Sequence, residues 1–115
     1  MAINKKIVLI FDKFALRDNS LHLPDDLCWL ETENKKRVGF AVDNGTDATI
    51  TVQPIGIIGS VKANLGSSVN VSAKSSEIVS LNLNDHFALA VSVSIHAITS
   101  PTDGRITVFG AWQDA

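Results

Sequence analysis

Three histidines are the side chains best suited to proton transfer near neutral pH, and they lie far apart in the sequence. His22, His86 and His96 show none of the short spacings that bring two ligands to one metal ion. Asp85 precedes His86, but a hydrolytic pair there would need a nucleophile brought in by the fold. Cys28, the only cysteine, has apolar neighbours that predict a buried side chain rather than a reactive thiol. We therefore expect no catalytic residues and no enzyme activity.

Acidic side chains gather in one irregular stretch, where oxygen ligands could hold calcium. Asp25, Asp26, Glu31 and Glu33 lie close together, but their spacing lacks the D-x-D-x-D-G pattern of an EF-hand loop. The glycines of residues 56–59 lack the Lys-Ser/Thr of a phosphate-binding loop. We predict a solvated acidic loop and no metal or cofactor; whether the loop binds calcium is left open by the sequence.

Composition excludes several classes of partner. The chain has 115 residues, a net charge of −2 and 19% charged residues, which argues against binding to nucleic-acid phosphates. The apolar run at residues 7–11 is too short for a secretory signal or a membrane span. A single cysteine excludes an intrachain disulfide. We expect one β-sandwich domain over residues 1–115, made in the cytoplasm without a signal peptide and binding neither nucleic acid nor membrane.

Aromatic side chains would have to carry carbohydrate binding, because sugar rings stack on flat aromatic faces. The chain has no tyrosine, and its two tryptophans are Trp29 and Trp112. Trp112 is in phase with the apolar residues Ile106 and Val108, which favours a core position. A small carbohydrate-binding module, with Trp29 and Trp112 as stacking residues, is our alternative function.

The elements that must position these residues are predicted to be strands. Residues 87–97 alternate apolar and polar side chains, as a strand with one buried face does. A turn at residues 100–104 predicts a hairpin of 87–98 with 105–113, and Asn44-Gly45 predicts another of 38–42 with 50–52. Residues 55–68 predict a loop with one short strand. Six to eight short strands predict an all-β fold, a two-sheet antiparallel sandwich of jelly-roll or immunoglobulin-like type.

The polar side of residues 87–97 is unusual for a solvated sheet. It carries Ala90, Ser92 and Ser94, with His96 at the end, where exposed strands commonly carry Lys, Glu or Thr. Small uncharged side chains suit a contact with another protein, so we predict these four residues as an interaction surface. The alternative is that the chain itself covers this side. The leading hypothesis is a non-catalytic structural domain that forms homo-oligomers, with a virion or phage-like assembly as one setting.

Overall fold

The computed structural model describes residues 5–25, 28–33 and 35–114, and within these ranges the chain is built from short strands. The elements are β1 (Lys5–Phe14), β2 (Leu30–Glu31), β3 (Lys35–Asn44), β4 (Ile50–Ile58), β5 (Val61–Asn64), β6 (Val69–Val71), β7 (Ser75–Asn82), the 3-10 turn η1 (Leu83–Asp85), β8 (Ala90–Ala97) and β9 (Ile106–Asp114). Nine strands exceed the six to eight predicted, because β2 and β6 are only two and three residues long. No helix among the described residues is long and apolar enough to cross a membrane.

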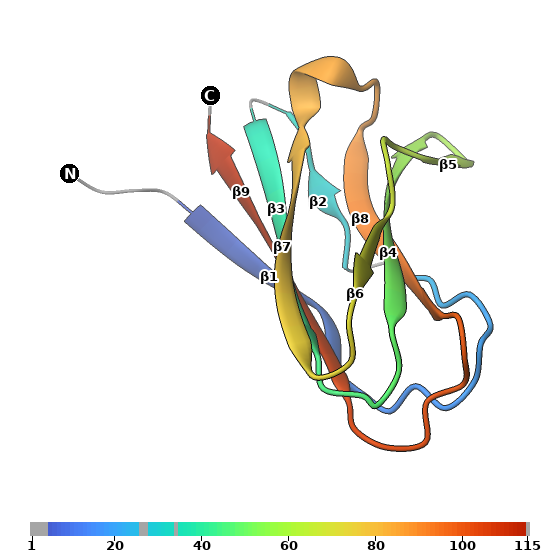
Figure 1. Ribbon diagram of the computed structural model, residues 1–115. Coiled ribbons are helices and arrows are strands. Elements are labelled where there is room, and N and C mark those ends of the chain that lie inside the picture. The colour runs from blue at the N-terminus through green and yellow to red at the C-terminus, as the bar shows by residue number, and fades with distance from the viewer. Residues whose placement is uncertain (1–4, 26–27, 34, 115) are drawn as a thin grey trace.

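The strands form two antiparallel sheets that pack against each other (Figure 1). One sheet has four strands in the order β1-β9-β3-β7. The other has five, with β2-β8-β4-β5 in a row and β6 beside β5 on the same edge of β4. This arrangement confirms the predicted two-sheet antiparallel β-sandwich.

The hydrophobic core lies between the sheets and is lined by residues of every strand except β5, whose four residues are all exposed. On β8 the odd-numbered residues Val91, Val93 and Ile95 are completely buried, so the predicted register of this strand is confirmed. The opposite sheet contributes apolar side chains with the same period of two, which is the pattern of strands that are buried on one face. The largest fully buried side chains are Phe40, Leu16, Leu30, Ile50, Ile95 and Ile106.

The predicted start of the β8 strand was wrong. Phe87 and Leu89 were expected on its buried face, yet they are 94% and 67% exposed, and the strand begins only at Ala90. Asn82 ends the preceding strand, because its side chain accepts a hydrogen bond from the Asn84 amide at the start of η1. The chain then crosses from the sheet of β7 to the sheet of β8, so residues 86–89 do not extend the strand β7.

Both predicted hairpins were also wrong, because their strands lie in different sheets. β3 and β9 belong to the four-stranded sheet, whereas β4 and β8 belong to the other. The glycines that suggested tight turns serve a different purpose. Gly45 does not have the positive φ of a type I′ turn, and its amide donates to the Arg105 carbonyl at 2.9 Å. The β3–β4 and β8–β9 connections cross at this point. A Cβ on Gly104 would lie 1.9 Å from the Gly45 oxygen, so the two backbones can approach this closely only because position 104 is glycine.

A true hairpin instead joins β4 to β5, in the stretch predicted to be mostly loop. Ile58 pairs with Val61 across the two residues Gly59 and Ser60. Gly59 has a φ of 60°, the left-handed conformation that glycine adopts at little cost. The turn signal was therefore present in the sequence, but the flanking residues do not alternate cleanly.

Asp47 joins the same two crossing connections through its carboxylate. Oδ1 accepts hydrogen bonds from the Thr102 amide at 2.9 Å and the Asp103 amide at 3.4 Å, and Oδ2 accepts one from the Thr102 hydroxyl. The Thr102 hydrogen bonds lower the pKa of Asp47 to about 2. The charged form of the Asp47 carboxylate is therefore more favoured in the folded protein than in the unfolded chain.

We expect this carboxylate to make folding stability depend on pH in acid. A group whose pKa falls on folding stabilises the protein above its ordinary pKa of 3.8, and that stabilisation is lost as the pH falls toward about 2. Thermal melts give the melting temperature at each pH. Across this pH window the melting temperature should change less steeply with pH for Asp47→Asn than for the wild type. Because other carboxylates titrate in both proteins, the difference between the two profiles isolates Asp47. Parallel profiles would contradict the prediction.

Candidate interaction surface

The structure places the predicted interaction surface of β8 largely under the chain's own residues. Ser92 and Ser94 point away from the core, yet they are 0% and 3% exposed. The Ser92 hydroxyl donates to the Cys28 carbonyl at 2.9 Å, which ties β8 to the segment before β2. Ala90 and His96 are half-buried. Ser92 and Ser94 are thus not exposed to a second molecule, and the contact surface predicted from them needs another location.

Trp29 and Lys62 explain why small side chains are required on this face. Trp29 precedes β2 at one edge of the five-stranded sheet, and Lys62 lies on β5 at the other edge. The Lys62 ammonium is nevertheless 5.7 Å from the centre of the Trp29 ring. Because β8 and β4 lie between these strands, the two side chains must reach toward each other over the sheet. Serine leaves room for that cover, which is the alternative that the sequence left open.

Neither tryptophan faces the other, so they form no joint stacking platform. Trp29 lies beside the five-stranded sheet, whereas Trp112 is near the end of β9 in the four-stranded sheet. Trp112 is half-buried against the core, and the Lys35 ammonium is 5.3 Å from its ring centre. Each indole therefore has a cation–π contact within the chain.

The titratable residues singled out in the sequence do not converge on one site. His22 is 2.8 Å from Asp18 in an exposed loop, and this hydrogen bond is the main reason that the pKa of Asp18 is lowered. Burial, followed by the charge of Asp25, raises the pKa of Cys28, which disfavours the reactive thiolate. Among the side chains that the structure describes, no three of His, Cys, Asp or Glu are placed to hold a metal ion. Asp26 lies outside the described residues.

A large exposed apolar surface lies instead on the outer side of the four-stranded sheet. Four large side chains on it remain exposed to different degrees: Ile7 by 67%, Leu9 by 39%, Ile78 by 76% and Phe109 by 43%. Smaller positions fill the space between them. We call this surface the apolar face and define it by Ile7, Leu9, Gly39, Ala41, Ile78, Phe109 and Ala111.

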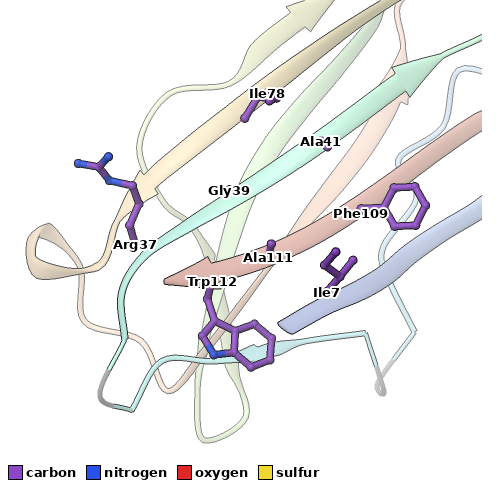
Figure 2. Close-up of a pocket in the computed structure, with 8 residues that line it drawn as sticks. All are labelled: Ile7, Arg37, Gly39, Ala41, Ile78, Phe109, Ala111 and Trp112. Atoms are coloured by element: carbon purple, nitrogen blue, oxygen red, sulfur yellow. The ribbon is translucent and has the colours of Figure 1, made fainter. Parts of the chain in front are cut away.

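The residues of the apolar face lie in two neighbouring rows that run across all four strands, and the polar Ser80 completes the first row. The backbone pairing places Ile7, Ala111, Gly39 and Ser80 in the first row. It places Leu9, Phe109, Ala41 and Ile78 in the second. Figure 2 shows residues of both rows on adjacent strands, with Arg37 and Trp112 at one end. The eight residues drawn in Figure 2 surround a shallow hollow of about 530 Å³.

Sequence reasoning missed this face although a signal was present. Ile7 and Leu9 alternate with Val8 and Ile10, so β1 is apolar on both sides. Phe109 likewise follows Val108, which is buried in the core. An antiparallel strand with one solvated side normally alternates with polar residues. Apolar residues on both sides of β1, at residues 7–10, and of β9, at Val108 and Phe109, indicate a second buried or contacting face.

Comparison with known proteins shows a likeness of fold but does not assign the chain to a family. No protein-family profile matches the chain, and no curated protein matches its sequence. The SPBc2 prophage-derived protein YomS is similar in structure, with a TM-score of 0.56 and 12% identity, over 97% of this chain and 95% of that one. A structure described as Bacillus endospore appendages forming disulfide-linked pili has a TM-score of 0.46 and 12% identity, over 99% and 90% of the two chains. The chain thus shares its β-sandwich fold with the prophage-derived protein YomS.

Proposed function

We propose that this chain is a non-catalytic structural domain that self-associates as a component of a larger protein assembly. The supporting observation is the apolar face, on which Ile7 and Ile78 keep 67% and 76% of their surface exposed. Contiguous apolar patches on soluble proteins mark contact sites, because leaving them in water costs roughly 25 cal/mol for each Å². A protein surface that covers this face would recover that free energy.

A second group of exposed apolar side chains would extend the assembly beyond two copies. Leu89 is 67% exposed, and its amide donates to the Ile57 carbonyl at 2.9 Å, next to the β4–β5 turn. Ile58 and Val61 pair across that turn and are 48% and 67% exposed. A contact that a two-fold axis closes ends at two copies, so a larger particle needs a second surface of this kind.

The setting that we propose is a virion or phage-like particle. The sandwich fold that this chain shares with the prophage-derived protein YomS is compatible with that setting. A fold can host unrelated functions, so the proposal depends on the exposed surfaces and not on the likeness. Carbohydrate binding gains no support from the tryptophans, because each ring already contacts a lysine.

Light scattering coupled to size-exclusion chromatography tests the proposed function. The monomer has a mass of 12.3 kDa. We expect the wild-type mass to exceed this value and to rise between micromolar and millimolar concentration. A mass of one chain throughout that range would overturn the proposal.

A further inference from the structure

We propose that two copies of this chain pack apolar face to apolar face about a two-fold axis that lies in the interface, at right angles to the strands. This inference rests on the proposed function and specifies its first contact. Each strand of one copy would then lie antiparallel to the same strand of the second copy. Three features support a second copy of the chain as the partner of this face: its area, its shape and the placement of its charges.

The outer side of the four-stranded sheet, taken from the row of Arg37 to the row of Asp43 with the apolar face at its centre, has the area that a weak, specific dimer needs. Four strands about 4.8 Å apart and roughly eight residues long, at about 3.3 Å per residue, cover roughly 500 Å². Two copies would bury about 1,000 Å² together, which is near the lower limit of specific interfaces. A dimer of this size should exchange with monomer at accessible concentrations.

The shape of the face is complementary to itself under this axis. The axis brings the first row of one copy onto the second row of the other. Phe109 would then face Ala111 of the second copy, and Ile78 would face Ser80. Gly39 would face Ala41 at the centre, where two sheets can approach closely. Large side chains thus meet small ones along β9 and β7, as tightly packed sheets require. On the edge strand β1, the two large side chains Ile7 and Leu9 would meet each other at the border of the contact.

The charges on β3 distinguish this axis from its main competitor. Arg37 and Asp43 are six positions apart on one strand, so both point to the outer side, about 20 Å from each other. The proposed axis places Arg37 of each copy beside Asp43 of the other. An axis parallel to the strands would also match large side chains with small ones. It would, however, gather both arginines at one end of the dimer and both aspartates at the other.

Matched lysine substitutions test whether the apolar face is the contact. Ile78→Lys places an ammonium group in the face, whereas Ile98→Lys makes the same change at a residue of similar exposure outside it, 76% against 62%. We expect Ile78→Lys to remove this contact and to lower the mass below that of the wild type, and Ile98→Lys to leave the wild-type mass. Ile7→Lys, on the opposite edge strand, should act as Ile78→Lys does. Circular dichroism checks that each variant is folded.

Charge reversal then tests the axis. Arg37→Asp alone and Asp43→Arg alone each create two like-charge contacts in the proposed dimer, so the dissociation constant should rise about tenfold or more. An equal mixture of the two variants restores both opposite-charge contacts. The carboxylate introduced by Arg37→Asp faces the guanidinium introduced by Asp43→Arg, and the unchanged Asp43 of the first variant faces the unchanged Arg37 of the second. We expect the mixture to regain the wild-type dissociation constant.

The outcomes separate the two proposals. A monomeric wild type overturns the proposed function and this inference together. A wild-type oligomer that survives Ile78→Lys and Ile7→Lys overturns the inference and leaves the proposed function intact. Loss of the dimer in the lysine variants, without recovery in the charge-reversed mixture, overturns the proposed axis. Loss in the lysine variants with recovery in the mixture supports the whole inference.

Discussion

Val93→Asp is expected to abolish folding, whereas Val61→Asp leaves the protein folded. Val93 lies in the middle of β8, paired with Pro54, and none of its surface is exposed. An unpaired carboxylate there loses its hydration, at a cost of several kcal/mol. A domain of this size has only about 5–15 kcal/mol of stability to lose. Circular dichroism during urea unfolding would show a variant that is unfolded, or barely folded, without denaturant.

Val61→Asp is the matched control, because it makes the same chemical change on another strand. Val61 lies on the edge strand β5 and is 67% exposed, so its carboxylate would stay hydrated. We expect a change of about 0.5 kcal/mol or less. Ser92→Asp should resemble Val93→Asp, since Ser92 is fully buried although it points out of the core. Equal stability losses from Val93→Asp and Val61→Asp would contradict the burial of Val93 in the core and the exposure of Val61 at the sheet edge.

The contrast between Val93 and the hairpins shows what could be predicted from the sequence. Alternation along residues 91–97 reports a local property, the direction of each side chain, so the buried face was predicted correctly. Which strand pairs with which depends on contacts between distant residues. Asn44-Gly45 has the composition of a hairpin turn, but Gly45 packs on Arg105 in another connection. No local pattern distinguishes these two uses of the same dipeptide.

The interaction surface illustrates the same limit on the functional side. Ser92 and Ser94 have small side chains, which predicts close packing, but the sequence does not say what packs on them. The answer includes the chain's own segment before β2, which the pairing of Leu30 with Val91 holds beside β8 and whose Cys28 carbonyl accepts a hydrogen bond from Ser92. The apolar face was more accessible to prediction, because the continuous apolar run at residues 7–11 already showed that both sides of the middle of β1 lack charged residues.

Asn44 holds the first crossing connection, and its side chain is fully buried. Its amide nitrogen is within hydrogen-bond distance of three carbonyl oxygens, at 2.9 Å from Ala48, 3.0 Å from Val71 and 3.1 Å from Ser72. Its oxygen accepts hydrogen bonds from the amide and the hydroxyl of Thr46, at 3.1 and 2.6 Å. One side chain therefore joins the end of β3 to the segment between β6 and β7 and fixes the path of the chain between the sheets.

Asn44→Ala should cost at least about 3 kcal/mol of unfolding free energy, because several buried polar groups lose their partner at once and each unsatisfied group costs roughly 1–3 kcal/mol. Asn82→Ala is the matched control: Asn82 is exposed and its side chain accepts one hydrogen bond, from Asn84, so about 1 kcal/mol should be lost. Asn44→Asp keeps the acceptor for Thr46 but sets a carboxylate against the three carbonyl oxygens, and it should be at least as harmful as alanine. Urea unfolding of the three variants measures these differences. If Asn44→Ala lost no more stability than Asn82→Ala, the buried amide would not be what holds the crossing connection in place.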